Sequence, residues 1–340
     1  MTLAVEVSDL TKSFNDVVAV SGLDLEIEAG TVHGLLGPNG AGKTTTVRTL
    51  STLLHPDAGA VRVFGADVAE SPDAVRSMIA LVGQHTALDD LLTGRENLRM
   101  IGRLFRLSSQ EAKQRAEQML ARFGLADAAD RAVKTYSGGM ARRLDLAASM
   151  MGQPKLIFLD EPTTGLDPRS RLEVWDMVRD LVAGGVTVVL TTQYLDEADQ
   201  LADRLSVIDQ GANIATGTPA ELKERIGGRR IEITVNHAGG LDLAAMVLER
   251  KLGTSQTDRQ QLTVSAPWPA EAALSDLTAA LAEVGVAVGS ATVRQPTLDE
   301  VFLALTGHAA QVADEPDAAT AKAARKAKKQ SRKERKENAT

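Results

Sequence analysis

Hydrophobic and polar positions alternate through much of residues 1–30. Residues 4–10, 17–20 and 23–27 follow this pattern, which puts apolar side chains on one face of an extended segment. Alternation with polar partners is typical of antiparallel strands that keep one face in solvent. Residues 32–36 form a short apolar run instead, which predicts a buried strand. The chain therefore begins with a predicted antiparallel sheet followed by one buried strand.

The next residues predict a helix and then a strand. Residues 44–54 have helical character, and the predicted helix ends before Pro56 because proline cannot continue it. Pro56 and Gly59 mark a turn, after which residues 60–64 predict another strand.

From about residue 93 to residue 152 the pattern becomes helical. Thr93 and Glu96 form a predicted capping box, in which the hydroxyl accepts from the Glu96 N–H while the carboxylate reaches back. Helices are predicted over residues 109–123 and 139–152. Strand patterns then return at three places: 155–159, 186–192 and 204–208. The unbroken β-branched run at 186–192 favours a parallel sheet that is covered on both faces.

A second predicted module begins near residue 227. It alternates strands and helices, which indicates a small α+β domain of ferredoxin-like type. The strands are expected at 230–235, 260–265 and 286–293, and the helices near 241–251 and 269–284. No chemical motif is visible in it.

Length and composition narrow the class of protein. The 340 residues suffice for two compact domains, and 44% of them are apolar. The absence of cysteine excludes disulfides and thiolate metal sites and fits a reducing interior. Neither a secretion signal nor an apolar run of about eighteen residues is visible, so we expect a soluble chain whose role at a membrane would need a partner.

Charge is unevenly placed along the chain. The formal net charge is −7, yet residues 321–340 carry +7, so the remainder sums to −14. A block rich in Ala, Lys and Arg cannot bury apolar surface, so residues 308–340 are expected to be a disordered basic tail. A solubilising tail and attraction to anionic lipid both explain the basic block. Nucleic-acid binding lacks supporting aromatic residues or motifs.

Residues 37–44 read G-x-x-x-x-G-K-T, the pattern of a phosphate-binding loop. Its glycines permit close backbone approach, and its N–H groups together with the positive end of the following helix attract phosphate. Lys43 would neutralise the β- and γ-phosphates, and Thr44 would offer its hydroxyl to Mg²⁺. A buried strand before the loop and a helix after it are the expected context.

Asp160 and Glu161 follow the apolar run 156–159 and form the second half of the predicted site. Asp160 would hold Mg²⁺, directly or through water, and Glu161 would orient and polarise the attacking water. A third feature is Ser137, which with Gly138 and Gly139 opens a helix and offers a second anion site. One chain already has a complete phosphate cradle, so a second one makes sense only if it serves a neighbour's nucleotide.

The chain resembles the ATP-binding subunits of ATP-binding-cassette (ABC) transporters. In chain order, the matching features are the phosphate loop, Gln84, the signature Tyr136-Ser-Gly-Gly-Met140, Asp160-Glu161, Gly165-Leu-Asp167 and the switch position 193. Residues 92–98, 191–198 and 297–303 are similar, more narrowly, to daunorubicin/doxorubicin-resistance-type drug-export subunits. The resemblance thus reaches about residue 307.

This resemblance implies an α/β fold of the P-loop NTPase type with a parallel core sheet, an antiparallel β subdomain and a helical subdomain. The implied ABC ATP-binding domain spans residues 1–226, with its helical subdomain at about 86–152. The α+β accessory domain would then span residues 227–307 and precede the basic tail.

The resemblance also assigns roles to residues. Phe14 would stack on adenine, Gln84 would contact Mg²⁺ or its water, and Asp167 would hydrogen-bond across a dimer of cassettes. Ser137, Gly138 and Gly139 would touch the γ-phosphate held by the partner chain. The implied catalytic residues are Glu161, Lys43, Gln193 and Gln84, and the implied nucleotide contacts are Phe14, Gly37, Pro38, Asn39, Gly40, Ala41, Gly42, Lys43, Thr44 and Thr45.

Gln193 departs from the family, most of which has histidine at this switch position. Glutamine keeps a hydrogen-bond donor but gains no proton near neutral pH. A mechanism that needs histidine as the general base is therefore excluded, and Glu161 must serve. The same substitution recurs in the drug-resistance-type subunits, so an active site is still expected.

We therefore expect an ATPase, using ATP and Mg²⁺, that powers export of a drug-like or hydrophobic compound. The expected partners are a second ATP-binding subunit, forming a homodimer, and separate membrane-spanning permease subunits that contact residues 84–105 at the cytoplasmic face of the cell membrane. No nucleic acid is expected. Two alternatives remain: a soluble ABC-type ATPase acting on nucleic acid or the ribosome, and a non-hydrolysing ATP-gated assembly module, against which Asp160 and Glu161 argue.

Overall fold

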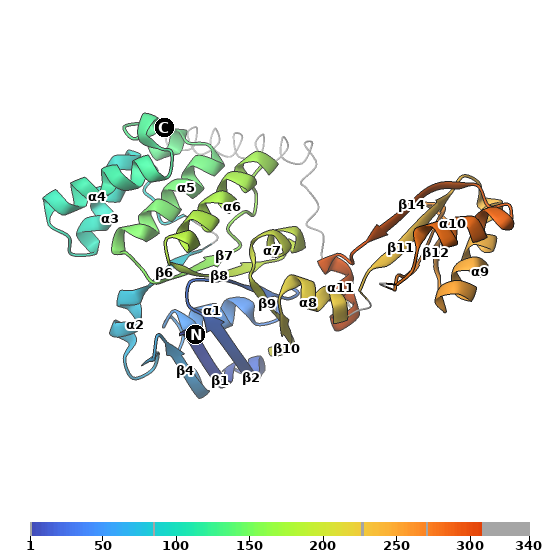
Figure 1. Cartoon of the computed structure of the whole chain (residues 1–340). Helices are drawn as coiled ribbons and strands as arrows, with labels where there is room; N and C mark the ends of the chain where they lie inside the picture. The colour runs from blue at the N-terminus through green and yellow to red at the C-terminus, as the bar shows by residue number, and fades with distance from the viewer. Residues whose placement is uncertain (1, 84–85, 226–227, 270, 308–340) are drawn as a thin grey trace, which may run out of the picture. The chain divides into compact units, whose positions relative to one another are not determined.

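A computed structural model describes residues 2–83, 86–225, 228–269 and 271–307 (Figure 1). The predicted antiparallel sheet is confirmed. Its strands are β1 (Leu3–Phe14), β2 (Val17–Glu28), β4 (Ala58–Val63) and β5 (Ala66–Asp67), in the spatial order β2-β1-β4-β5. The two predicted stretches 17–20 and 23–27 belong to the single strand β2. The alternating pattern breaks at residues 21–22, but the strand continues because its pairing with β1 shifts register on both sides of Leu10.

The predicted parallel sheet is also confirmed, and it forms the centre of the fold (Figure 1). Its order is β10-β9-β3-β8-β7-β6, and only β10 runs antiparallel to its neighbour. The bounds are β3 (Val32–Leu36), β6 (Ile79–Val82), β7 (Leu156–Asp160), β8 (Thr187–Thr192), β9 (Arg204–Asp209) and β10 (Ala212–Gly217). Strands β3 and β8 are buried at every position, as their unbroken apolar and β-branched runs predict.

Helices lie between these strands. They are α1 (Lys43–Leu50), α2 (Pro72–Met78), α3 (Gly94–Leu104), α4 (Ser109–Arg122), α5 (Gly138–Ser149), α6 (Pro168–Ala183), α7 (Leu195–Leu201) and α8 (Pro219–Arg225). The capping box of Thr93 and Glu96 is present at the start of α3. The prediction that the first helix reaches residue 54 is wrong: α1 ends at Leu50, because Thr52 adopts the left-handed conformation with φ +63°.

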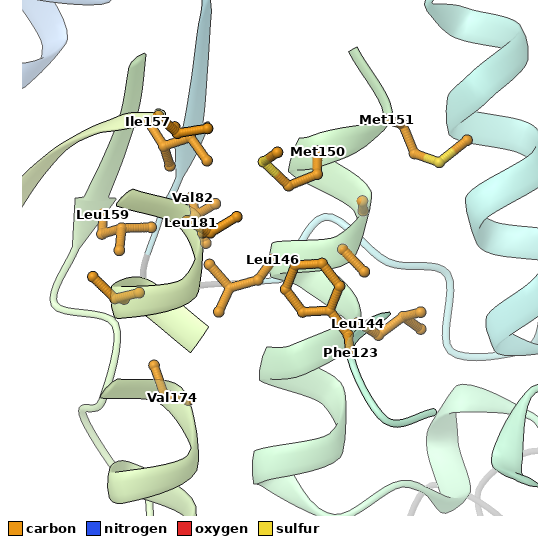
Figure 2. Close-up of a cluster of buried hydrophobic side chains, with 14 of the residues drawn as sticks. Val82, Phe123, Leu144, Leu146, Met150, Met151, Ile157, Leu159, Val174 and Leu181 are labelled. Carbon is orange, nitrogen blue, oxygen red and sulfur yellow. The ribbon is translucent and has the colours of Figure 1, made fainter. Parts of the chain in front are cut away.

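The largest hydrophobic core joins the central sheet to the helical part of the chain (Figure 2). Val82 and Ile157 come from the neighbouring strands β6 and β7, whereas Leu144 and Leu146 come from α5, and all four are almost completely buried. Helix α5 therefore packs on β6 and shares its hydrophobic core with β7, the strand whose end carries Asp160.

His33 lies in β3, where it is 1% exposed and its Nε2 is 2.9 Å from Ser206 Oγ. Burial, and secondarily the charge of Arg204, lowers its pKa from 6.5 to about 4. The unfolded chain therefore binds a proton between these two values that the folded chain does not, so stability falls as the pH falls through this window. Each pH unit below 6.5 lowers the free energy of unfolding by about 1.4 kcal/mol. Between pH 8 and pH 5 we therefore expect the free energy of unfolding to fall by about 2 kcal/mol.

Urea unfolding of His33→Asn at pH 8 and pH 5 tests this expectation. The variant should lose less stability between the two pH values than the wild type does, by about 2 kcal/mol. His237→Asn, at an exposed position, is the matched control and should keep the wild-type difference. An equal pH dependence in wild type and His33→Asn would exclude His33 as the cause.

Residues 228–307 contain a second α+β unit. Its order of elements is β11 (Arg230–Val235), α9 (Leu241–Leu252), β12 (Gln256–Asp258), β13 (Thr263–Pro267), α10 (Leu274–Glu283), β14 (Val288–Arg294) and α11 (Leu298–Thr306). The four strands form an antiparallel sheet in the order β12-β13-β11-β14. This succession and strand order are those of the ferredoxin-like arrangement that the sequence predicts. Strand β12 escaped prediction because its three residues are polar and exposed.

Helix α11 packs against the first part of the chain. Its buried residues Leu298, Val301 and Phe302 share a hydrophobic cluster with Leu195 of α7 and Leu222 of α8. Truncation after Gly227 would therefore remove α11 from this cluster. A change in a truncated chain could then come from lost packing around α7 and α8 as well as from loss of the accessory unit itself.

Substitution of Phe302 by alanine should destabilise the chain by about 3 kcal/mol, because a buried aromatic ring would leave a cavity. Leu303→Ala is the neighbouring control: Leu303 is 48% exposed and should change stability by less than about 0.5 kcal/mol. Urea unfolding of both variants at constant pH measures the difference. Equal effects of the two substitutions would contradict the packing of α11 described above.

Candidate functional site

The loop between β3 and α1 has the geometry of a phosphate cradle. Gly42 precedes α1 at φ +102°, and a Cβ atom there would lie 2.4 Å from the Ala19 carbonyl oxygen. At Gly37 a Cβ would lie 2.2 Å from the Ile208 carbonyl oxygen. Only glycine fits at either position. No side chain caps the N-terminus of α1, so the N–H groups of its first turn remain available to an anion.

Lys43 is 7% exposed and folds over this loop. Its Nζ donates to the carbonyl oxygens of Gly37, at 2.7 Å, and Pro38, at 2.9 Å. Burial lowers the pKa of Lys43, and the nearby charges of Glu161 and Asp160 oppose that shift. The loop thus carries a positive charge that the two carboxylates keep in place.

A cavity of about 210 Å³ is lined by the loop and by Glu161 together. The lining residues are Ala19, Asn39, Gly40, Ala41, Gly42, Lys43, Thr44, Thr45 and Glu161. The structure thus brings residues 39–45 together with the carboxylate that the sequence places more than a hundred positions later. Neither Ser137 nor Gly139 is among the lining residues of the described chain.

Asp160 and Glu161 lie at the end of β7, where Thr191 of the neighbouring strand β8 holds both of them. The Thr191 hydroxyl donates to Asp160 Oδ1 at 2.5 Å, and the Glu161 N–H donates to the Thr191 carbonyl oxygen at 3.0 Å. Glu161 has φ +50°, a left-handed conformation that glutamate rarely adopts without support. Sequence reasoning missed Thr191, although its place at the end of an adjacent parallel strand could have suggested it.

The donor set near this cavity fits a magnesium ion. Thr44 and Asp160 offer the oxygen ligands that Mg²⁺ prefers, and an ion bound by few protein groups keeps waters and substrate phosphates as its other ligands. No cluster of three or more His, Cys, Asp or Glu side chains suited to a metal occurs within the described ranges. The third predicted ligand, Gln84, lies outside the described residues.

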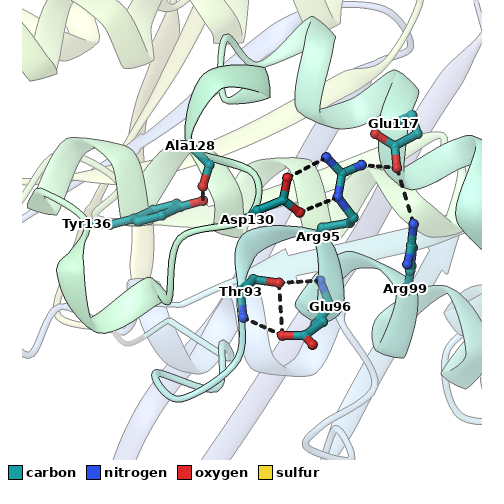
Figure 3. A network of polar contacts seen from close by, with 8 residues as sticks. All are labelled: Thr93, Arg95, Glu96, Arg99, Glu117, Ala128, Asp130 and Tyr136. Atoms are coloured by element: carbon teal, nitrogen blue, oxygen red, sulfur yellow. Dashed lines mark hydrogen bonds and ion pairs between the residues drawn. The ribbon is translucent and has the colours of Figure 1, made fainter.

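Ser137 is the N-cap of α5, and its Oγ accepts from the Met140 N–H at 3.2 Å. Figure 3 shows the polar network that holds the preceding segment. The Tyr136 hydroxyl donates to the Ala128 carbonyl oxygen at 2.7 Å, and Arg95 of α3 pairs with Asp130 at 2.7 Å and also with Glu117. These contacts position the signature segment relative to α3 and α4.

Asp167 is the N-cap of α6 and lies close to the signature. Its carboxylate accepts from the Ser170 N–H at 3.0 Å and from the Ser170 hydroxyl at 2.7 Å, and these bonds lower the pKa of Asp167. A Cβ at Gly139 would lie 2.5 Å from Ser170 Oγ, so Gly139 packs directly against this turn. Gly138 has no comparable close contact.

Gln193 is half-buried and directly follows β8, two residues after Thr191. The next residue, Tyr194, stacks on Arg171 of α6, with the guanidinium 4.6 Å from the ring centre. The switch position therefore lies between a strand that holds Glu161 and a helix that packs against α6.

Phe14 lies at the end of β1 and is 44% exposed. Lys12 lies over its ring and pairs with Asp57 at 2.6 Å. Phe14 is not among the lining residues of the phosphate cavity, whereas Ala19, on the strand that pairs with β1, is. Its predicted role in adenine binding stays a prediction.

A second cavity, a groove of about 380 Å³, lies between the central sheet and the helical part. Met100 and Phe105, which lie in the stretch 84–105 expected to contact a permease, line it. Leu88 packs against the main core instead, and neither Leu91 nor Leu92 lines the groove. Sequence reasoning missed most of the remaining lining, which comes from residues outside 84–105: Ser51, Leu53, Arg76, Ile79, Ala80, Leu81, Val82, Asp145, Ala148 and Ser149.

None of the helices with described positions combines the length and apolarity needed to cross a bilayer.

Comparison with known families gives two matches. Residues 20–164 match the family described as "ABC transporter", and residues 217–306 match the family described as "ATP-binding protein DrrA1-3-like, C-terminal domain". Among solved structures, an "ATP binding subunit of ABC transporter" is 27% identical with a TM-score of 0.59, covering 66% of this chain and 93% of that one. CbiO1 from Clostridium perfringens, described as part of an ABC transporter complex, is 26% identical with a TM-score of 0.62, covering 66% of this chain and 94% of that one.

Curated relatives match nearly the whole chain. The daunorubicin resistance ATP-binding protein DrrA3 of Streptomyces coeruleorubidus is 54% identical over 92% of this chain and 98% of its own length. The daunorubicin/doxorubicin resistance ATP-binding protein DrrA of Streptomyces peucetius is 52% identical over 94% of this chain and 97% of its own length. Nothing in these relatives supports the alternative of an ATPase acting on nucleic acid or the ribosome. The chain belongs to the ABC transporter family, as an ATP-hydrolysing subunit similar along its length to the DrrA resistance proteins.

Proposed function

We propose that this chain powers export of a drug-like, hydrophobic compound through a separate membrane-spanning permease, and that it works at the cytoplasmic face of the cell membrane. The single observation that carries the proposal is the 54% identity to a daunorubicin resistance ATP-binding protein along nearly the whole chain, accessory unit included. The accessory unit supports the narrower assignment, because residues 217–306 match a domain described for DrrA-like proteins. We also propose the domain limits 1–226 and 227–307.

We propose that ATP binds in the cavity lined by residues 39–45. The N–H groups of the loop and of the first turn of α1 bind the phosphates, and Lys43 neutralises their charge. Glu161 lines the same cavity and accepts a proton from the water that attacks the terminal phosphorus, while the bond to the ADP oxygen breaks. Thr44 and Asp160 would hold a magnesium ion, with Gln84 as the further ligand expected from the resemblance, and the ion would supply positive charge to the phosphate oxygens. Gln193 donates to the terminal phosphate, and Phe14 stacks on adenine.

Two copies of the chain are proposed to complete each site. Ser137, Gly138 and Gly139 lie at the positive N-terminal end of α5, yet they line no part of the phosphate cavity of the same chain. A second chain placed head to tail would bring its signature to that cavity, with Asp167 hydrogen-bonding across the interface. ATP then holds the two chains together until it is hydrolysed.

The groove between the sheet and the helical part is the proposed permease contact. Five large apolar side chains that line it are exposed: Leu53, Leu81, Met100, Leu104 and Phe105. Exposed apolar side chains gathered in one groove are typical of a protein interface. The family supplies the class of occupant, since ATP-binding subunits of ABC transporters work with separate transmembrane partners.

Reconstitution tests the proposed function. The tagged chain is purified from detergent-solubilised membranes of its source organism, and the membrane protein that co-purifies is placed with it in vesicles. We expect ATP-dependent movement of doxorubicin, followed by its fluorescence, and stimulation of ATP hydrolysis by the drug. Leu104→Asp should abolish co-purification, whereas Leu172→Asp, at an exposed position outside the groove, should not. A complex that hydrolyses ATP but moves neither doxorubicin nor other amphipathic drugs would overturn the export proposal.

A further inference from the structure

Helix α5 carries a buried ion pair between Arg142 and Asp145. Each residue is 6% exposed, and Arg142 Nη1 lies 3.4 Å from Asp145 Oδ2. Burial lowers the pKa of Arg142 and raises that of Asp145, and each partner's charge opposes the shift of the other. Charged side chains are rarely buried in this way unless hydrogen bonds and a partner compensate the loss of water.

Arg142 donates its hydrogen bonds to two backbone carbonyls outside its own helix. Its Nε donates to the Pro162 carbonyl oxygen at 2.7 Å, and its Nη1 donates to the Gly83 carbonyl oxygen at 2.7 Å. Pro162 directly follows Glu161, and Gly83 directly follows β6. One side chain on the signature helix therefore holds the segment that carries the proposed catalytic carboxylate.

Gly83, which Arg142 contacts, precedes residues 84–86 in the sequence, and Asp145 contacts Ala87, which follows them. Asp145 Oδ1 accepts from the Ala87 N–H at 3.3 Å. Asp145 and Ala87 both line the 380 Å³ groove proposed for the permease, whereas Pro162 and Glu161 do not. The ion pair thus spans the distance between the groove and the segment of Glu161.

We propose that Arg142 and Asp145 are a positioning pair that transmits occupation of the groove to Glu161. A partner that presses on Asp145 or Ala87 would move Arg142, and Arg142 would move the Pro162 carbonyl. This inference rests on the proposed function, because the groove matters only if a membrane subunit occupies it.

Glu161 is sensitive to such a movement because of its backbone. A glutamate at φ +50° keeps that conformation only while its surroundings hold it there. The described support includes Thr191, Thr164, whose N–H donates to the Glu161 carbonyl oxygen at 3.3 Å, and the Arg142 contact to Pro162. A displacement of about 1 Å at a reacting group can cost on the order of a hundredfold in rate.

A double substitution distinguishes a role of the ion pair in positioning Glu161 from a role in stabilising the fold alone. Removing one partner of a buried ion pair leaves an uncompensated charge and destabilises the fold, but replacing both by apolar residues of similar size is often tolerated. We therefore compare Arg142→Met/Asp145→Leu with the wild type in the full-length chain. We expect kcat for ATP to fall on the order of tenfold to a hundredfold, with KM for ATP within about twofold and an unchanged unfolding midpoint. A double variant with wild-type kcat would overturn the proposal, as would a fall in kcat that follows lost stability.

Arg115→Met is the matched control. Arg115 lies in the same helical part and donates to a backbone carbonyl, that of Met151 at 3.0 Å, but touches neither the groove nor residues 160–167. It should leave kcat unchanged.

Amide hydrogen exchange gives a second measurement that needs no turnover. Exchange at Ala87 and across residues 161–164 should be faster in the double variant than in the wild type, while α9 should be unaffected. Unchanged exchange at both places would contradict the positioning role. These measurements need no membrane partner and no drug, so their failure is distinguishable from failure of the export proposal.

Discussion

Substitution of Glu161 by glutamine should reduce ATP hydrolysis by at least about a hundredfold while ATP binding persists. Glutamine keeps the size of the side chain but cannot accept a proton from water, and general bases contribute about 10²–10⁴-fold to rates. The phosphate cradle should persist in this variant, because Lys43 still bonds to the Gly37 and Pro38 carbonyl oxygens and Asp160 still favours its charge. Since bound ATP is not consumed, the variant should accumulate as an ATP-bound dimer.

Three measurements on purified protein check this expectation: phosphate release, ATP affinity and molecular mass with and without ATP. Glu173→Gln is the control, because Glu173 of α6 pairs with Arg169 and Arg143, neither of which lines the cavity. Hydrolysis by Glu161→Gln near the wild-type rate would exclude Glu161 as the base. Gln193 is not an alternative base, since an amide takes up no proton near neutral pH.

The parts of the fold and site that sequence reasoning predicted well are those encoded locally. Residues 37–44 specify their own loop, because Gly40 and Gly42 adopt positive φ values of +82° and +102°, which favour glycine. The capping box at Thr93 follows from the spacing of two residues, and the burial of β8 follows from its own unbroken run of β-branched and apolar side chains. In each case the physical cause lies within a few positions of the residue concerned.

The parts that sequence reasoning missed depend on contacts between distant segments. Arg142 donates to the backbone carbonyls of Gly83 and Pro162. Every residue has a backbone carbonyl, so the residue types in the sequence do not indicate which ones Arg142 will contact. Thr191 holds Asp160 and Glu161 only because β7 and β8 are neighbours in the sheet. The groove proposed for the permease is similarly non-local, since ten of its fifteen lining residues lie outside 84–105, including all four residues of β6.

Two inactive variants of this chain should restore ATP hydrolysis when they are mixed. Lys43→Ala removes the positive charge from the phosphate loop, and Ser137→Arg blocks the signature end of α5 with a bulky cation. In the proposed dimer every site uses the loop of one chain and the signature of the other, so each variant alone should form dimers in which both sites are damaged. A mixed dimer, however, has one site with both defects and one with neither.

The expected recovery can be stated for equal amounts and random pairing. Half of the dimers are then mixed, and half of their sites are intact, so up to about a quarter of the wild-type rate should return. A mixture of Lys43→Ala with Glu161→Gln is the control, because it tests whether recovery requires two residues that different chains contribute to one site. Lys43 and Glu161 line the same cavity of one chain, so this mixture contains no intact site and should stay inactive. No recovery with Ser137→Arg, although mixed dimers form, would contradict a site shared between the loop of one chain and the signature of the other. Recovery in the control would contradict a site that takes both Lys43 and Glu161 from one chain.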